Sequence, residues 1–531
     1  MKKICAFLMT LVLTIAVTGQ TLNVKVGCVV YQFPADQTGE MTYTDGTQLT
    51  IMGKTFSLSD IDAMTVDGTE VKNNLVTVAY EAGSATVYVA GNVAQYVEPT
   101  LSGAHVTIAQ SNTEAVDDGE ITYQLSGMTA NGSLNLSGLF KCTVSLADVT
   151  LTNPSGAAIN ITNPKRIQIS AKKGTTNTLT DGVGGEQKAC LYSKGQIQFQ
   201  GNGVLNVVGK TAHAIKSGDY ISIKNLTLNV TSAVSDGINC EEYVLVKSGV
   251  VSISGVGDDG IQCDLEGEKS TGETEDHDDE DSGNIYIEGG MLTLDVATKG
   301  IKAQGDLRIS DGTITATSSG HEAIEAKGEM TILDGTVYAF SKTDDAINAG
   351  SHMYLKGGTV TGVSNGNDGI DTNGNMYISG GNIIACGSGQ PECGLDAAER
   401  YKLYITGGTV LAIGGGNNTV TSTSGSQCVL STTGSPTAGT VVSVKSGSTE
   451  LASFTVPTGY SPSSGGFGGG GFGGGFGGFG GGGRPGGGGQ SGSSSFSYLL
   501  SCPGLTSGTS YTVTIGSSSS SCKAATSYSG K

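Results

Sequence analysis

Residues 345–370 read DAINAGSHMYLKGGTVTGVSNGNDGI and contain the pattern that decides the fold. The stretch opens with Asp-Ala-Ile347 and closes with Asp-Gly-Ile370, two similar phrases that each end in isoleucine. Related phrases end at six other anchor positions, Ile215, Ile238, Ile261, Ile301, Ile324 and Leu395. Most successive anchors are separated by about 23 residues, the exceptions being the intervals that end at Ile301 (about 40) and Leu395 (about 25). A period of this length indicates a repeat architecture in which each unit stacks on the next.

Within each repeat, apolar and polar residues alternate over runs such as Met353–Leu355. Alternation with period 2 predicts strands, and runs this short cannot form stable helices. A glycine at a fixed place before the third strand predicts a turn with positive φ. These glycines are Gly249, Gly312, Gly335, Gly358 and Gly381. Three strands in each repeat of about 23 residues predict an all-β parallel β-helix, because one coil cannot bury its apolar face alone.

The composition excludes several classes of protein. Glycine supplies 85 of the 531 residues, only 15% are charged, and the formal net charge is −19. Collagen is excluded because glycine keeps no third-residue period. Abundant Gly, Thr, Ser, Val and Ile argue against a helix bundle, since these residues favour turns and strands. No nucleic-acid partner is expected, because a chain this acidic lacks the basic face that binds phosphates.

The ends of the chain differ from its middle. Lys2 and Lys3 precede an uncharged apolar run and small residues, which predicts a cleaved signal peptide at residues 1–19. No later stretch is long and apolar enough to span a bilayer, so we expect a secreted or cell-surface protein. The remaining predicted segments are a small N-terminal β module at 20–72, an N-terminal cap with irregular coils at 73–158, a regular β-helix at 159–430, and a C-terminal β cap at 431–531 with a flexible Gly/Phe insertion at 465–489.

A ninth anchor, Leu191, fits one step before Ile215. Small residues occupy the place two positions after each anchor, and this place should point into the core as the anchor does. They are Ser193, Ser217, Cys240, Cys263, Ala303, Ala326, Ala349, Thr372 and Ala397. Cys240 and Cys263 then stack on neighbouring coils, either as packed thiols or as a disulfide. Cys386 with Cys393, and Cys502 with Cys522, are further possible pairs that the sequence does not decide.

Acidic and amide side chains recur one place after the anchors and two places before them, where we expect them to face solvent along one edge. Such a row of like charges repels itself, and Ca²⁺ would offset the repulsion, since calcium takes carboxylate and amide oxygens as ligands. The alternative is that these residues only cap turns. The candidate calcium ligands are Asp236, Asn239, Asp258, Asp259, Asp264, Glu322, Glu325, Asp344, Asp345, Asn348, Asp368, Asp371 and Asp396. The acidic insertion at 264–281 is a further, weaker candidate.

A second outward column, rich in tyrosine, lies seven places after the anchors and includes Leu245, Arg308, Thr331, Tyr354 and Tyr377. Tyr286 and Tyr404 take the same place once local length changes are allowed. The candidate ligand-binding residues of this column are Tyr286, Arg308, Tyr354, Tyr377 and Tyr404. Tyrosine rings on a flat β face can contact sugar rings through their apolar faces and donate hydrogen bonds through their hydroxyls. The alternative is an ordinary cross-strand aromatic ladder with no ligand.

Several phrases in fixed order resemble one known family. They include Gly103-Ala-His-Val-Thr-Ile108, Ile121-Thr-Tyr-Gln-Leu-Ser-Gly127, Gly174-Thr-Thr-Asn-Thr-Leu179 and the repeated Asp-Gly-Ile and Gly-Gly-Thr-Val. Over about residues 75–430 the chain resembles the calcium-dependent carbohydrate-binding β-helix family of clostridial and Bacteroidetes exported proteins. The resemblance implies a right-handed parallel β-helix like that of pectate lyases, and calcium held by Asp-rich turns. It also implies a plant-wall polysaccharide partner such as polygalacturonate or cellulose. The coil with Lys299 and Lys302 departs from this pattern.

Three functions remain open at this stage. The first is a non-catalytic, calcium-dependent protein that binds acidic or plant-wall polysaccharide. The second is a calcium-dependent polysaccharide lyase, for which Lys302 or Lys299 is the only base we can name. The third is a structural or adhesive surface protein in which calcium only stiffens the repeat array.

Overall fold

The computed structural model describes residues 19–265, 282–398, 400–415, 427–463 and 496–528. It divides into two compact units, Met1–Ile314 and Thr315–Lys531, which we call unit 1 and unit 2. The predicted signal peptide through residue 18, the acidic insertion from 266 to 281 and the Gly/Phe insertion lie outside the described residues. Among the described residues, no helix is long and apolar enough to cross a bilayer.

Unit 1 begins with antiparallel pairing. Strand β1 (Thr21–Val26) pairs with both β2 (Val29–Pro34) and β6 (Ala63–Asp67), while β3 (Thr42–Thr44), β4 (Gln48–Ile51) and β5 (Lys54–Ser57) form a separate small sheet. Strand β2 also pairs in parallel with β8 (Ser84–Ala90), so hydrogen bonding continues past residue 72. The next elements are β7 (Leu75–Glu81), a 3-10 turn η1 (Gly91–Val93), β9 (Val97–Ser102), β10 (Ala104–Gln110), β11 (Ile121–Thr129), β12 (Gly132–Ser137) and β13 (Cys142–Thr152).

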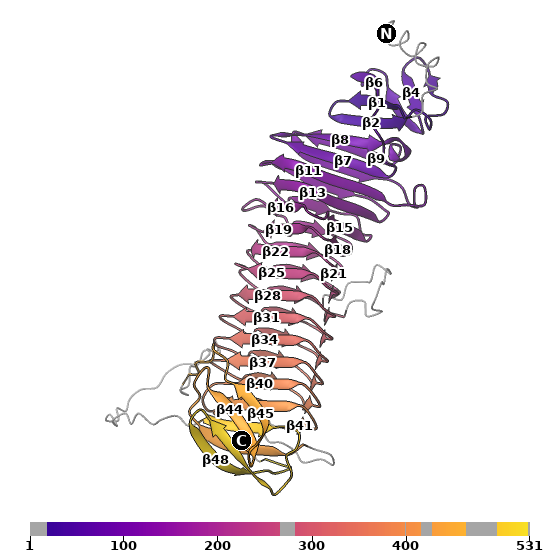
Figure 1. Ribbon diagram of the computed structural model, residues 1–531. Helices are drawn as coiled ribbons and strands as arrows, with labels where there is room; N and C mark the ends of the chain where they lie inside the picture. The colour runs from indigo at the N-terminus through magenta and orange to yellow at the C-terminus, as the bar shows by residue number, and fades with distance from the viewer. Residues whose placement is uncertain (1–18, 266–281, 399, 416–426, 464–495, 529–531) are drawn as a thin grey trace, which may run out of the picture. The chain divides into compact units, whose positions relative to one another are not determined.

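The rest of unit 1 is built from three parallel ladders, to each of which every repeat adds one strand (Figure 1). Ladder 1 continues from β10 and β12 through β14 (Ile159–Ile161), β17 (Ala189–Ser193), β20 (His213–Ser217), β23 (Ile238–Cys240), β26 (Ile261–Cys263) and β29 (Ile301–Ala303). Ladder 2 contains β15 (Ile167–Ala171), β18 (Ile197–Gly201), β21 (Ile221–Ile223), β24 (Tyr243–Val246), β27 (Asn284–Ile287) and β30 (Leu307–Ile309). Ladder 3 contains β16 (Thr176–Thr180), β19 (Val204–Val208), β22 (Thr227–Ser232), β25 (Val250–Ser254) and β28 (Met291–Val296).

Unit 2 repeats the same three ladders, and β31 (Thr313–Ser318) contains the boundary between the units. Its ladder 1 is β32 (Ile324–Ala326), β35 (Ile347–Ala349) and β38 (Ile370–Thr372). Its ladder 2 is β33 (Met330–Ile332), β36 (Met353–Leu355), β39 (Met376–Ile378) and β41 (Leu403–Ile405). Its ladder 3 is β34 (Thr336–Ser341), β37 (Thr359–Ser364), β40 (Asn382–Cys386) and β42 (Thr409–Gly414).

A C-terminal group of antiparallel strands completes unit 2. Strand β46 (Phe496–Ser501) pairs with β42 and with β43 (Val429–Gly434). A four-stranded sheet follows, in the order β45 (Thr449–Thr455), β44 (Val441–Ser446), β47 (Ser510–Ile515) and β48 (Ser518–Lys523). The described chain is therefore all-β, with long parallel ladders of a β-helix-like kind.

The register explains why the sequence repeats. Ile324 pairs with Ile347, which pairs with Ile370, so each anchor stacks on the anchor of the next repeat. All nine small residues two places after the anchors are fully buried, as predicted. The five turn glycines have φ between +71° and +113°, which confirms the predicted turns. At this position a side chain would strain the backbone and meet the neighbouring rung, meaning the strands of the next repeat.

Candidate functional site

The aspartates two places before the anchors hold the backbone of the following rung. In unit 1 the Oδ1 atom of Asp236 accepts a hydrogen bond from the N–H of Asp259 at 3.1 Å. In unit 2 the Oδ1 atom of Asp345 accepts from the N–H of Asp368 at 3.0 Å, and that of Asp368 accepts from the N–H of Cys393. One carboxylate oxygen of each aspartate thus caps a turn, and the second oxygen remains available for other partners.

The predicted exposure of these side chains is wrong. They lie along one ladder, but neighbouring rungs cover them, because stacked strands are only ~4.8 Å apart and each carboxylate bonds to the next rung. The buried members are Asp236, Asn239, Asp259, Glu322, Glu325, Asp345 and Asp368. Asp264, Asp344, Asn348, Asp371 and Asp396 are half-buried, and Asp258 is exposed. Burial raises the free-energy cost of ionising each carboxylate, so the stability of its charged form depends on the partners around it.

In unit 1 basic side chains lie beside two of the acidic residues. The Nζ atom of Lys302 is 3.2 Å from Asp259 Oδ2, and it donates to Gln262 Oε1 at 3.0 Å. The Nδ1 atom of His213 accepts a hydrogen bond from the N–H of Asp236 at 3.4 Å and lies 3.1 Å from Asp236 Oδ2. Oxygens of Asp236, Asp258 and Asp259 lie within 4.8 Å of one another, yet two of the three carboxylates have a basic partner.

The same contacts bear on Lys302 as a catalytic base. An ammonium group held by a buried carboxylate and an amide oxygen is a proton donor rather than an acceptor. Lys299 contacts the same carboxylate through its backbone, whose N–H donates to Asp259 Oδ1 at 3.0 Å. The arrangement of Lys302 therefore does not suit the base that a lyase reaction needs.

Unit 2 holds a different group, which we call the unit 2 acidic cluster: Asp345, Asn348, Asp368 and Asp371. Asn348 and Asp371 are partners in register on β35 and β38, and Asn348 Nδ2 donates to Asp345 Oδ2 at 3.3 Å. Within the described part of unit 2, no Lys or Arg lies within ion-pair distance of the three carboxylates. The three carboxylates therefore have no basic partner there to stabilise their charged forms.

The pKa values of the cluster reflect this arrangement. Burial, reinforced by the neighbouring Asp396 and Asp371, raises the pKa of Asp368 to about 8. Burial and the Asp396 carboxylate raise the pKa of Asp371 to about 7. Burial together with Asp368 and Asp371 raises the pKa of Asp345 well above its ordinary range. Each shift means that the folded protein resists ionising these groups unless a positive charge arrives.

One amide atom points to what would supply that charge. The Oδ1 atom of Asn348 is buried and accepts no hydrogen bond, although its Nδ2 donates to Asp345. A buried acceptor without a donor is costly, and an amide oxygen beside three carboxylates is a normal calcium ligand set. Oxygens of these types are the ligands that a hard cation prefers, but among the described residues Asp345, Asp368 and Asp371 do not form a group whose ligand atoms all lie within 4.8 Å of one another.

Two further groups of possible ligands lie in unit 2. His321, Glu322 and Asp344 form one, and Asp368, Cys393 and Asp396 form the other, with ligand atoms within 4.8 Å of one another. The sequence analysis missed His213, His321 and Cys393. A signal existed for His213, because His-Ala-Ile215 places it where other repeats have aspartate. Glu325 pairs with Lys327 instead, and Asp264 accepts from Asn239 Nδ2 at 3.0 Å.

The tyrosine column divides between the units. In unit 2, Tyr354, Tyr377 and Tyr404 stack with ring centroids 5.1 Å apart and interplanar angles of 7° and 8°. The rings are half-buried, and both faces of Tyr377 are covered by its neighbours. The stack therefore presents ring edges and hydroxyls rather than the ring faces that we expected to be open. The ring of His352 lies edge-on to Tyr354, Tyr377 and Tyr401, with centroids 6.1–6.5 Å apart.

In unit 1 the column does not form an open surface. Tyr286 is only 9% exposed and belongs to a separate buried cluster with Tyr220, Tyr243 and Leu245. Its hydroxyl accepts a hydrogen bond from Asn284 Nδ2 at 2.8 Å. Arg308, its partner in register, is exposed. The exposure predicted for Tyr286 is wrong, because tyrosines on neighbouring rungs pack against it.

Comparison with known proteins adds a family. A family model described as "Carbohydrate-binding domain-containing protein" matches residues 102–383, slightly more than half of the chain. The chain belongs to this family. It is also similar to a solved structure described as the polysaccharide lyase-like protein from C. thermocellum, determined as a gadolinium derivative. Sequence identity is 20%, the TM-score is 0.41, and the match covers 49% of this chain and 99% of that one. No curated protein matches significantly.

The segment that matches the carbohydrate-binding domain family includes the acidic residues of unit 1, the unit 2 acidic cluster and part of the tyrosine stack. The unit 2 acidic cluster, Tyr354 and Tyr377 lie inside residues 102–383, whereas Tyr404 follows them. The two features occupy different ladders of unit 2, the acids on ladder 1 and the tyrosines on ladder 2. They are therefore separate surfaces of the same repeats.

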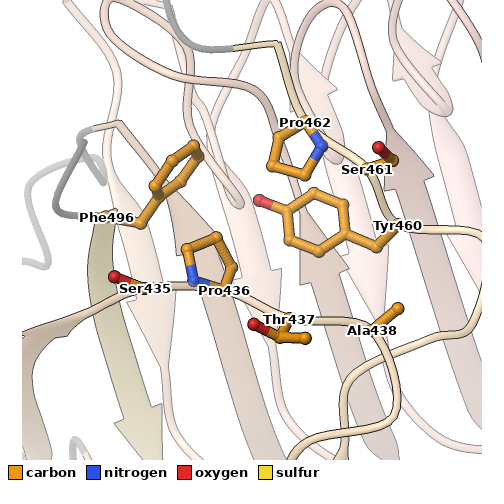
Figure 2. Close-up of a pocket in the computed structure, with 8 residues that line it drawn as sticks. All are labelled: Ser435, Pro436, Thr437, Ala438, Tyr460, Ser461, Pro462 and Phe496. Carbon is orange, nitrogen blue, oxygen red and sulfur yellow. The ribbon is translucent and has the colours of Figure 1, made fainter. Parts of the chain in front are cut away.

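A pocket of about 450 Å³ lies in the C-terminal part of this carbohydrate-binding domain protein, outside the matched segment (Figure 2). Rings of Tyr460, Phe496, Pro436 and Pro462 line it, with hydroxyls from Ser and Thr between them. The Tyr460 hydroxyl donates to the carbonyl oxygen of Gly387 at 2.5 Å, which fixes the ring. None of the eight lining residues is acidic or basic, so the pocket has no part in the charged sites.

Proposed function

We propose that this protein is an exported, non-catalytic, calcium-dependent polysaccharide-binding protein. In this proposal the repeats form a right-handed parallel β-helix with about 23 residues in each coil. The unit 2 acidic cluster holds calcium, and the tyrosine stack contacts sugar. Membership of a carbohydrate-binding domain family supports the polysaccharide partner.

The observation that carries the proposal is the charge balance of the two units. Asp236 and Asp259 of unit 1 lie within ion-pair distance of His213 and Lys302, whereas no Lys or Arg of the described part of unit 2 lies beside Asp345, Asp368 or Asp371, and neighbouring acids raise their pKa values. Buried charges are normally paired or coordinate metals. A calcium ion at the unit 2 cluster would satisfy the carboxylates and the amide oxygen of Asn348 together.

The ligand that fits best is an acidic plant-wall glycan such as polygalacturonate. A chain with a net charge of −19 repels a polyanion unless a cation lies between them. Calcium keeps free coordination positions after binding three or four protein oxygens, and uronate carboxylates would fill them. The edges of the half-buried rings of Tyr354, Tyr377 and Tyr404 in the same unit would add direct contacts.

Isothermal titration calorimetry against polygalacturonate tests the proposal, with the full chain in calcium and in a chelator. We expect binding in calcium, much weaker binding in the chelator, and loss of the calcium effect in Asp371→Asn. Asp334→Asn is the matched control, because Asp334 is an exposed aspartate of the same unit. Equal binding with and without calcium would refute the calcium part. Calcium-raised melting without any glycan binding would favour the structural or adhesive alternative.

A further inference from the structure

The tyrosine stack of unit 2 has basic side chains on both sides. Lys356 directly follows β36, so by strand alternation it shares the outward face with Tyr354. Lys402 directly precedes β41 and shares the outward face with Tyr404. Both lysines are exposed. They stand on opposite flanks of the tyrosine column, two rungs apart.

Both lysines are available to an acidic ligand. Within the part of the chain that the structure describes, no carboxylate lies within ion-pair distance of Lys356 or Lys402. The ammonium of Lys356 lies 5.3 Å from the centre of the Tyr354 ring, a cation–π contact that leaves its hydrogen-bond donors available.

The surface between the lysines is held in place before any ligand arrives. The Tyr377 hydroxyl accepts from Asn375 Nδ2 at 3.1 Å, which leaves its own proton free to donate to a ligand. His352 Nδ1 accepts from the N–H of Asn375 at 2.9 Å, and its ring lies edge-on to Tyr354 and Tyr377. The three tyrosine rings follow one another along the column at 5.1 Å.

We infer that this face is a second, calcium-independent contact surface for an acidic glycan, with Lys356 and Lys402 as its specificity-determining residues. The inference rests on the proposed function, and adds direct recognition of uronate carboxylates by ammonium groups. An extended glycan chain lying along the stack places successive rings over successive tyrosine edges. Its carboxylates pass between the two lysines, while tyrosine hydroxyls bond to sugar oxygens. A neutral glycan would use the hydroxyls but gain nothing from the lysines.

Calorimetry in a chelator at low salt isolates this surface, with oligogalacturonate as the acidic probe and a cello-oligosaccharide as the neutral one. For Lys356→Gln/Lys402→Gln we expect about fivefold weaker binding of oligogalacturonate, from two exposed ion pairs, and unchanged binding of the neutral probe. Added salt should weaken the binding of oligogalacturonate to the parent and hardly affect its binding to the double variant. Lys342→Gln, at another exposed lysine of unit 2, is the matched control. Tyr377→Phe, which keeps the stack, should weaken both probes.

The outcomes separate this inference from the proposed function. Equal affinity of parent and double variant for oligogalacturonate, or equal losses for both probes, would overturn the inference. Absence of any oligogalacturonate binding in the chelator, with binding restored by calcium, would also overturn it while leaving the calcium proposal intact. Absence of binding in both buffers would refute the proposed function itself. Circular dichroism of each variant confirms that the strands are retained.

Discussion

Replacing Asp368 by asparagine should stabilise the calcium-free protein above neutral pH. Asparagine removes the buried charge, and its Oδ1 atom can still accept the hydrogen bond from the N–H of Cys393. Burial and the neighbouring acids raise the pKa of Asp368 from its ordinary value of 3.8 to about 8. The folded protein therefore holds this proton more tightly than the unfolded chain does, and ionisation opposes folding.

The sign and size of the effect follow from that shift. Between about pH 4 and pH 8 the folded state binds more protons than the unfolded state, so the stability of the calcium-free parent falls as pH rises. A shift from 3.8 to about 8 corresponds to a loss on the order of 5 kcal/mol by pH 8. Relaxation and water entry reduce this, so we expect Asp368→Asn to gain about 1–4 kcal/mol at pH 8. The gain should vanish near pH 4.

Thermal unfolding followed by circular dichroism measures the effect. In a chelator at pH 8 the Asp368→Asn protein should melt roughly 5 °C above the parent. Calcium at 100 times its Kd should add about 2.7 kcal/mol to the parent and thereby offset most of this difference. Asp334→Asn, the exposed control, should follow the parent throughout. A parent whose melting temperature stays flat from pH 4 to pH 8, or a variant that melts lower at pH 8, would refute the reasoning.

Three further outcomes are expected. Lys302→Met should lower the free energy of unfolding by about 3 kcal/mol, because it leaves Asp259 buried without its basic partner. An unchanged midpoint of urea unfolding would contradict this. Gly249→Ala should lower the free energy of unfolding by about 2 kcal/mol, because φ is +104° and the new Cβ would lie 2.5 Å from a carbonyl oxygen of the neighbouring rung. Chemical denaturation of the parent and the variant measures this difference. A thiol reagent should label Cys28 at once in the native protein and the buried cysteines only after unfolding. A final count reduced by two would instead reveal one disulfide, and peptide mapping would show whether it joins Cys240 and Cys263, whose sulfurs are 3.3 Å apart.

The β-helix-like ladders could be predicted because every rung obeys the same steric demands. An anchor such as Ile347 and a small residue such as Ala349 must both fit a narrow core, and Gly358 must turn with positive φ. These demands are local and recur in every repeat, so they appear directly in the sequence. The antiparallel C-terminal sheet has no such period, and only its strand content was visible.

The candidate sites were harder to predict, because their chemistry depends on neighbours from other rungs. The sequence placed Asp236 and Asp345 in equivalent positions, but only coordinates reveal that His213 pairs with the first, and that no basic residue pairs with the second. Period-2 alternation also says which way a side chain points, not what covers it. For that reason Tyr286 was expected at the surface and is buried.

The hydrogen bond from each aspartate to the backbone of the next repeat has an evolutionary consequence. Because Asp345 Oδ1 and the N–H of Asp368 occupy equivalent positions in successive repeats, a tandem duplication of one whole repeat recreates the donor and the acceptor together, wherever the break falls. An array of this kind can lengthen or shorten by whole copies without orphaning a buried carboxylate, whereas a fractional copy would break the series. Gene-level copy number therefore becomes a direct means of adjusting how much surface the protein presents.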